Sequence, residues 1–188
     1  MRLCVKEFRK NCEIVGFRGV EINDIEAFLK VVNREKPPGV ELQFFDADLV
    51  VTWQHLYFAL LNALAAFKNG ETLSKSVAME TILYASGRRQ IQKATQLIGI
   101  KSSSRNMAVL IVGGKAEVVQ KALAKVSRHV GGQLDDSVLE LSEKKMENVR
   151  RAFDISGVEL ETVMEGDDVK KALVDLVVER VALLATTH

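Results

Sequence analysis

Residues 107–132, MAVLIVGGKAEVVQKALAKVSRHVGG, combine a strand pattern and a helix pattern with only a glycine turn between them. The first eight residues contain no polar side chain, and such a short run is typical of a strand buried on both faces. The following residues place apolar side chains at helical spacing, and Gly131 with Gly132 ends that helix. A buried strand followed at once by a helix predicts a fold that mixes helices with a central sheet.

The residues before this run predict two more strands and one helix. Residues 12–19, CEIVGFRG, and residues 40–45, VELQFF, have the composition of strands. Asn23 lies three residues before Glu26 and predicts a capping box for a helix over residues 23–36, which ends before the turn at Pro37, Pro38 and Gly39. We therefore expect a mixed central sheet flanked by helices.

Residues 52–99 predict three consecutive helices. Thr52 is the expected cap of the first helix, which is apolar nearly all round, Phe58 included, and is therefore expected to be central. Ser74 or Ser76 starts the second helix, and Gly87 ends it as a left-handed residue. The third helix follows at once, ends at Gly99, and has an inward stripe formed by Ile91, Ala94 and Ile98.

The last third of the chain predicts a strand at residues 138–141, a helix over 142–153, no clear element over 154–163, and a final helix over 168–184. One inward stripe of this final helix consists of Leu173, Leu176, Val177, Val181 and Leu184. A second apolar side is added by Val174, Val178 and Leu183. That side is either buried within the same domain or used to bind a partner.

Composition limits the class of protein. A chain of 188 residues fits one domain over residues 1–188, and a net charge of +1 gives no global field toward nucleic acid, so any basic site is local. Cys4 and Cys12 form neither a Cys-x-x-Cys pair nor a zinc pattern, which is typical of a reducing compartment. The charged N-terminus and the lack of a long apolar run predict a soluble cytoplasmic protein.

Residues 82–94, ILYASGRRQIQKA, have features that suit a phosphate. Arg88 and Arg89 follow Ser86 and Gly87 at a fresh helix N-terminus, where backbone amides, a hydroxyl and guanidinium groups come together. In the expected helix, Arg89 lies one turn from Lys93 on the outer side, as Arg88 does from Gln92. The alternative is a solvated basic face on a connecting helix. Lys75, Lys101 and Arg105 extend the patch only if the fold brings them near.

Other candidate sites give weaker signals. Gly113, Gly114 and Lys115 lie between a strand and a helix, where a nucleotide phosphate is often held, but neither the Walker pattern nor the dinucleotide pattern is present. An ordinary tight turn is the alternative. The three histidines, His55, His129 and His188, have no spacing typical of a metal site, and no catalytic constellation is visible. We therefore expect no metal and no cofactor. The acidic pairs at residues 46/48, 135/136 and 167/168 are interpreted as caps.

Three stretches carry a resemblance to a known family. They are residues 43–94, QFFDADLVVTWQHLYFALLNALAAFKNGETLSKSVAMETILYASGRRQIQKA, residues 107–114, MAVLIVGG, and residues 176–185, LVVERVALLA. Together they resemble the small regulatory subunit of the KEOPS tRNA-modification complex, the PRPK-binding protein family, in its archaeal form. The most specific elements are Lys75, the run Leu83 to Gly87, and Arg89-Gln90-Ile91.

The resemblance implies a non-catalytic protein that binds the kinase-like ATPase subunit of a complex that makes threonylcarbamoyladenosine in tRNA. It also implies binding to the single-stranded CCA end of tRNA, with the RNA-binding candidates Lys75, Ser86, Arg88, Arg89, Gln90, Lys93 and His55, and Tyr84 as a further platform. It supports Arg89 and Gln90 more than Arg88, and Trp53 departs from the small residue usual there. From the surplus apolar side of the last helix we assign partner binding to Val174, Val178 and Glu179. The alternative is a stand-alone phosphate-handling enzyme that uses Gly113 to Lys115.

Overall fold

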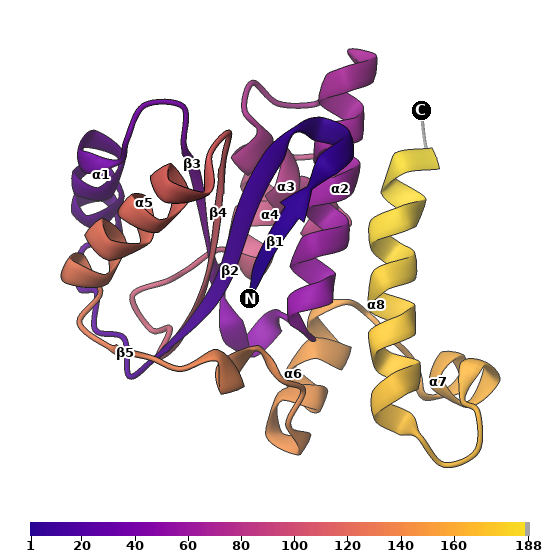
Figure 1. Cartoon of the computed structure of the whole chain (residues 1–188). Coiled ribbons are helices and arrows are strands. Elements are labelled where there is room, and N and C mark those ends of the chain that lie inside the picture. Colours follow the sequence, from indigo (N-terminus) through magenta and orange to yellow (C-terminus); the bar gives the residue numbers. More distant parts are fainter. Residues whose placement is uncertain (187–188) are drawn as a thin grey trace.

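A computed structural model describes residues 1–186, which form an antiparallel sheet with helices on both of its faces (Figure 1). The strand order is β1-β2-β4-β3, and β5 pairs with the end of β2. The strands are β1 (Arg2–Val5), β2 (Lys10–Arg18), β3 (Glu41–Asp46), β4 (Asn106–Gly113) and β5 (Gln133–Leu134). The expected combination of helices and a central sheet is confirmed.

The sheet is antiparallel in every described pair, whereas the sequence led us to expect a mixed sheet. The reason lies in the connection from β2 to β3. These two strands run in the same direction, but β4 is inserted between them and runs antiparallel to both. The crossover through the first helix therefore produces no parallel neighbours.

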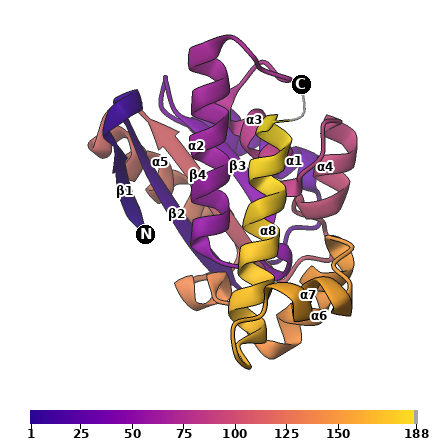
Figure 2. The same ribbon diagram turned by 90° about the vertical axis from the view of Figure 1, so that its right-hand side faces the viewer.

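The helices form two layers, one on each face of the sheet (Figures 1 and 2). One layer consists of α1 (Ile25–Glu35) and α5 (Ala116–His129). The other layer consists of α2 (Trp53–Asn69), α3 (Val77–Ser86), α4 (Ile91–Ile98) and α8 (Val169–Thr186). The short helices α6 (Glu143–Ala152) and α7 (Gly157–Val163) lie at one end of the second layer, and the 3-10 turns are η1 (Lys6–Phe8), η2 (Ala47–Leu49) and η3 (Asp136–Leu139).

The strand β4 is the centre of the hydrophobic core, as its apolar run predicted. Val109 and Ile111 pack in the cluster under α1 and α5, and Ala108 and Leu110 pack in the cluster under α2, α3 and α8. Alternate side chains of this one strand thus pack in both hydrophobic clusters, because successive residues of a strand point to opposite faces of the sheet. None of the helices described within residues 1–186 combines the length and the apolar composition of a membrane-spanning segment.

Several predicted helix starts are shifted or differently capped. Asp24, not Asn23, caps α1, and its Oδ1 accepts from the amide of Ala27 at 2.9 Å. Thr52 precedes α2, but its Oγ1 makes no cap hydrogen bond and is buried without a hydrogen-bond partner within residues 1–186. Ser76 caps α3, as one of the two predicted alternatives. The shift of one residue at α1 arises because two neighbouring polar residues compete for the same orphan amides.

Three local predictions are wrong or incomplete. Residues 136–139 form η3, not a strand, and neither β1 nor α7 was predicted. A capping box between Ser156 and Glu159 starts α7.

Helix α2 is not buried all round, because Phe58 is 41% exposed and Phe67 is also exposed. Of the acidic pairs interpreted as caps, Asp46, Asp135 and Asp168 accept backbone hydrogen bonds at element starts, as predicted. In contrast, Asp48 accepts from the side chain of Asn106, and Asp136 accepts from the amide of Gly16 in β2.

Candidate functional site

Helix α3 is the buried support of the candidate site, and Glu80 fixes the loop before it. The Glu80 carboxylate is fully buried and accepts from the amide of Leu73 at 3.1 Å and from the amide and hydroxyl of Ser74, each at 2.7 Å. These bonds hold the loop that presents the exposed side chain of Lys75. The role of Glu80 was not predicted, because a glutamate one turn into a helix is common for reasons of capping and dipole alone.

The link between α3 and α4 carries the two arginines. Gly87 adopts a left-handed conformation, with φ of 62°, as predicted. The amide of Gly87 donates to Tyr84 O at 3.0 Å and that of Arg88 donates to Leu83 O at 3.1 Å, which closes the end of α3. Helix α4 begins only at Ile91, so Arg88 and Arg89 lie in the link and not on the expected helix.

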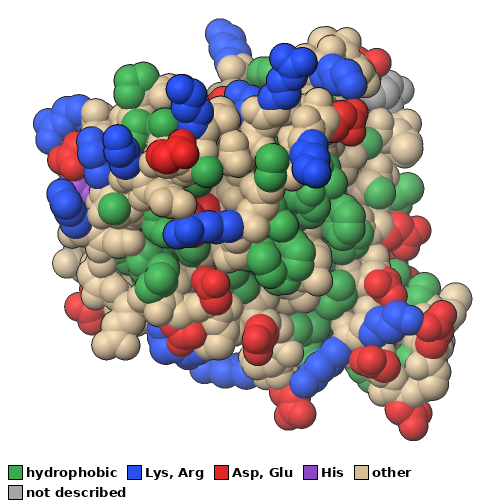
Figure 3. Space-filling model, viewed as in Figure 1, with side chains coloured by type: hydrophobic (Ala, Val, Ile, Leu, Met, Phe, Trp, Pro, Cys, Tyr) green, Lys and Arg blue, Asp and Glu red, His purple; other side chains and the backbone are tan. Residues whose placement is uncertain are grey.

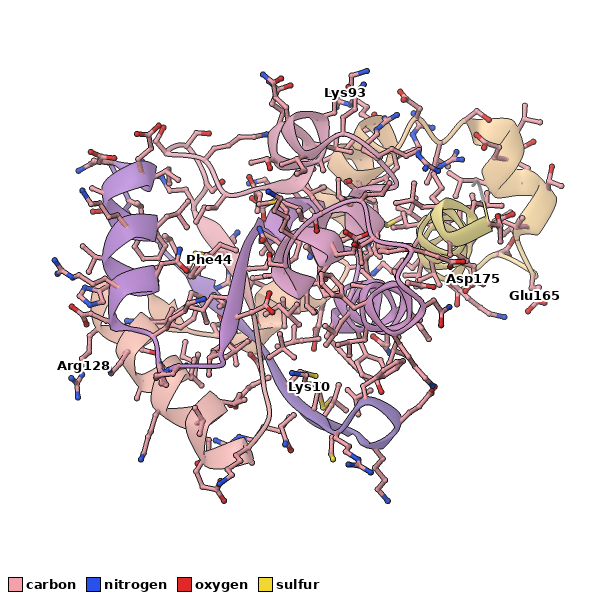
Figure 4. All side chains as sticks on the ribbon, turned by 90° about the horizontal axis from the view of Figure 1, so that it is seen from above. Lys10, Phe44, Lys93, Arg128, Glu165 and Asp175 are labelled. Carbon is pink, nitrogen blue, oxygen red and sulfur yellow. The ribbon has the colours of Figure 1, made fainter. Side chains whose placement is uncertain are left out.

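The whole run from residue 88 to residue 93 is exposed. It contains three cations, two amide side chains and Ile91, and no acidic residue. Ile91 is 43% exposed, which corrects the expected inward stripe of the third helix. Ile91 is the first residue of α4, whereas Ala94 and Ile98 lie further along the helix and are buried as predicted. Lys93 lies on the outer side of the molecule in Figure 4.

Arg88 and Arg89 have different surroundings. The Nη2 atom of Arg88 lies 3.6 Å from Oδ2 of Asp154, and both side chains are exposed. Asp154 has a positive φ of 51°, which is uncommon for a residue other than glycine. Burial raises the pKa of Tyr84 and the carboxylates of Glu80 and Glu71 raise it further, whereas the cation of Arg89 lowers it.

A cavity of about 320 Å³ opens beside this link. It is lined by Ser86, Gly87, Arg88, Phe153, Asp154, Arg180, Leu183 and Leu184, which come from α3, from α8 and from the link between α6 and α7. Arg180 donates from Nη2 to Glu159 at 2.9 Å, while its Nε is buried without a hydrogen-bond partner among the described residues. The cavity thus joins two guanidinium groups to an apolar wall.

Two predicted RNA contacts are wrong. His55 is fully buried; its Nε2 lies 2.7 Å from Ala85 O, and its ring meets the ring of Phe153 at 5.7 Å. Burial lowers its pKa to about 4, so the ring is neutral at pH 7 and Nε2–H donates to Ala85. The hydroxyl of Ser86 is also buried, donates to Leu83 O and accepts from the amide of Arg88. Both residues shape the link instead of touching a ligand.

The remaining predicted cations are distributed unevenly. Lys75 precedes α3 and Arg89 follows it, so the two lie at opposite ends of a helix about 15 Å long. Gln90 is exposed at the start of α4 and makes no side-chain cap. Arg105 approaches Glu21 at 4.0 Å, next to the end of β2, and so does not extend the patch. Tyr84 is buried and offers no open platform.

Of the two glycines beside Lys115, only Gly113 has a packing reason. A Cβ on Gly113 would lie 3.2 Å from Val119 and 3.3 Å from Val40, closer than ordinary contacts, whereas a Cβ on Gly114 would meet no atom within 4 Å. Gly113 therefore lets α5 approach the start of β3. Within residues 1–186 no group of three or more His, Cys, Asp or Glu side chains is arranged to hold a metal, and His188 lies outside the described residues.

A second candidate surface lies where α2 and α8 run side by side (Figures 1 and 2). On α8, Val174 and Val178 are half-buried and Glu179 is exposed. On α2, Tyr57 and Leu61 are half-buried and Phe58 is exposed. Figure 3 shows hydrophobic side chains gathered over this part of the molecule. We call these residues the α2–α8 face. Its α2 half was missed because we expected that helix to be central in the fold.

Comparisons with known proteins identify relatives over most of the chain. A family model described as "Kinase binding protein CGI-121" matches residues 18–185. The "Regulatory protein Cgi121" of Methanocaldococcus jannaschii is 33% identical over 165 residues, which cover 87% of this chain and 97% of that protein. The "EKC/KEOPS complex subunit CGI121" of Coccidioides immitis is 27% identical over 89 residues, 47% of this chain and 43% of that protein.

Proposed function

The chain belongs to the CGI-121 family of kinase-binding proteins, and we propose that it is a non-catalytic regulatory subunit of a KEOPS complex. In this role the α2–α8 face binds the kinase-like ATPase subunit, and the link between α3 and α4 binds the CCA end of tRNA. The complex then makes threonylcarbamoyladenosine with chemistry that another subunit supplies. The observation that carries the RNA-binding part is the exposed run 88–93 beside its cavity.

A single-stranded RNA end needs cations for its phosphates and flat or apolar surfaces for its unstacked bases. Arg89 and Lys93 provide exposed cations, and Arg88 provides a third that is partly neutralised by Asp154. Ile91 offers an exposed apolar surface between them, and the cavity of about 320 Å³ adds an apolar wall. This arrangement favours RNA over a free phosphate, which would need only the cations.

The direct test compares tRNA with and without its CCA end in a gel shift. We expect Arg89→Glu to weaken binding about tenfold, because an attraction to phosphate becomes a repulsion. Arg128→Glu is the matched control: it changes the charge equally on α5, and Arg128 lies far from Lys93 in Figure 4. Equal losses for both variants, or equal affinity for tRNA lacking CCA, would argue against the site.

The α2–α8 face has the composition of a protein interface, with aromatic and aliphatic side chains and a charged rim at Glu179. The two halves of the face come from helices that pack directly against each other. We propose that their half-buried and exposed apolar side chains form one surface. Contiguous apolar surface of this kind usually marks an interaction site. Membership of a kinase-binding family makes the kinase-like subunit the fitting occupant.

Co-purification with the kinase-like subunit tests this face. We expect Val178→Arg and Phe58→Arg each to reduce recovery of the partner at least about tenfold, because a cation would be buried in an apolar contact. Val158→Arg on α7 is the control, since Val158 is 73% exposed and lies outside the face. Full recovery with a variant that melts like the wild type would refute the assignment.

The non-catalytic part of the proposal is tested separately from binding. We expect the purified chain to show no ATP affinity and no ATP turnover by itself. Specific ATP binding that is lost on changing Lys115→Ala would favour the alternative, a phosphate-handling enzyme that uses the turn at residues 113–115.

A further inference from the structure

A separate cavity lies between the β1–β2 hairpin and the N-terminal half of α5. Its volume is about 240 Å³, and its lining includes Arg2, Cys4, Asn11, Glu13, Val119 and Gln120. In Figure 4 Lys10, the first residue of β2, lies on the opposite side of the molecule from Lys93, so the cavity is distinct from the proposed RNA site. The sheet residues of the cavity precede the segment matched by the family model.

The register of the hairpin places the polar lining on one face of the sheet. Arg2 pairs with Glu13, and Cys4 pairs with Asn11, so these four side chains point to the same side. That side is the one covered by α5, because Val15, two residues after Glu13, packs in the cluster that includes Val119 of α5. Strand β1 is at the edge of the sheet, and the cavity lies where the cover of α5 ends.

Glu13 is the decisive residue of this cavity. The side chain is buried, with 5% of the residue exposed, and its Oε1 accepts from Nε of Arg2 at 2.8 Å. Its other oxygen, Oε2, is buried and has no hydrogen-bond partner among residues 1–186. A buried carboxylate oxygen without a donor is destabilising, because it has lost its hydrogen bonds to water and gained none in return. The carboxylate therefore requires a donor that the described part of the chain does not supply.

Besides Glu13, the polar groups of the lining are the amides of Asn11 and Gln120 and the guanidinium of Arg2. Asn11 donates from Nδ2 to Gly114 O at 2.9 Å, which leaves its Oδ1 as an acceptor. Gln120 is exposed at the rim and adds a side-chain carbonyl. The cation of Arg2 is 64% exposed, so water screens most of its charge. The cavity thus offers a carboxylate oxygen and two amide oxygens to an incoming group.

We propose that this cavity binds a primary ammonium group, either of a free aliphatic diamine or of a lysine side chain on a partner protein. An ammonium has three N–H donors and matches three separate acceptors around a buried carboxylate. A guanidinium fits less well, because its fork needs both carboxylate oxygens and Arg2 already occupies Oε1. A metal ion fits less well too, since residues 1–186 contain no suitable group of three ligands.

Cys4 reports on occupancy, because it lines the cavity and is exposed, whereas Cys12 is buried. The experiment measures the rate of Cys4 alkylation by iodoacetamide in the folded protein. Cadaverine represents the free diamine, and a short acetylated peptide with one lysine represents the partner. We expect at least one of them to slow alkylation several-fold, while tetramethylammonium at equal ionic strength, which has no N–H donor, does not. Protection by cadaverine alone or by the peptide alone identifies the source.

The matched variants are Glu13→Gln and Glu117→Gln. Glu13→Gln keeps the shape of the side chain and removes the charged acceptor, so protection of Cys4 should be lost. Glu117 is exposed on the same helix turn as the cavity wall but does not line the cavity, so Glu117→Gln should keep full protection. If Glu13→Gln fails to fold, Gln120→Met at the exposed rim should weaken protection instead. No protection by either amine, or protection that survives both cavity variants, overturns the proposal.

Discussion

At the scale of single residues, His55 shows how burial decides between two roles for one side chain. Its ring lies between Ala85 O and the ring of Phe153, and its Nδ1 has no hydrogen-bond partner among the described residues. The direction of this side chain could not be predicted from the residue pattern, because its helix is apolar on nearly every side. Only the packing of α2 against α3 determines that His55 points inward.

His55 makes the stability of the protein depend on pH. Its pKa is about 4 in the folded protein, mainly because of burial, against 6.5 for an ordinary histidine. Below pH 6.5 the unfolded chain binds a proton that the folded chain does not, so the free energy of unfolding falls as pH falls toward 4. The full loss from this residue is on the order of 3 kcal/mol.

Urea unfolding at pH 7 and at pH 4.5 measures this effect. We expect the wild type to lose more stability over that interval than His55→Gln, whose amide does not titrate, even though the variant starts from a lower stability. His129→Gln is the control, because His129 is only partly buried and pairs with Glu35 at the surface. Equal pH dependence in the wild type and His55→Gln would show that His55 is not the titrating group.

At the scale of elements, the residues of β4, α5 and α8 could be predicted because their apolar spacing is long and regular. The residue at which α4 starts could not be predicted from local spacing. Arg88 and Arg89 continue a helical pattern in the sequence, but the left-handed Gly87 and the contact of Arg88 with Asp154 hold them in a link. Asp154 is 66 residues away along the chain, so no local pattern contains this information.

The same lack of long-range information in the local sequence explains why only part of the candidate site could be predicted. The sequence and the family resemblance together pointed to Lys75, Arg89, Gln90 and Lys93, all of which are exposed. The cavity beside Arg88 was not predicted, because its walls come from α3, from α8 and from the link between α6 and α7, which are far apart in the sequence. Ser86 and His55 were misassigned for the opposite reason: polar residues near a motif look accessible until tertiary packing buries them.

Substitution of Gly87 tests whether the conformation of the link between α3 and α4 matters for stability and for tRNA binding. A Cβ at this position would meet no atom closer than 3.6 Å, so the cost of Gly87→Ala comes from its left-handed φ of 62° and not from a clash. That cost is on the order of 1 kcal/mol. We expect a small decrease in melting temperature together with weaker tRNA binding, because the arginines shift with the backbone.

Gly114→Ala is the matched control for this variant, since Gly114 has open space around its Cα and no left-handed conformation. It should change neither stability nor tRNA affinity. A Gly87→Ala protein that is destabilised but binds tRNA as tightly as the wild type would mean that the geometry of the link does not matter for the ligand.

At the scale of the whole molecule, the sheet separates the surfaces that carry the proposed functions. The arginine link and the α2–α8 face belong to the helical layer on one side, and the hairpin cavity lies on the side covered by α5. Leu183 and Leu184 of α8 line the cavity beside the link, while Val174 and Val178 of the same helix belong to the α2–α8 face. One rigid helix thus connects the proposed RNA site to the proposed partner site.

The net charge of +1 allows a specific prediction of how tRNA affinity depends on salt. A nearly neutral molecule has only its local cations to attract phosphates. If Arg88, Arg89 and Lys93 each neutralise one phosphate, the logarithm of the affinity should fall with the logarithm of salt concentration with a slope of about −2, from about 0.7 per phosphate of a single strand. A contact at Lys75 would add a similar increment. We expect Arg89→Ala to reduce the slope by about 0.7, and Arg128→Ala to leave it unchanged. A wild-type slope several times steeper would mean that tRNA lies on a much larger surface than this link, and an unchanged slope in Arg89→Ala would remove Arg89 from the contact.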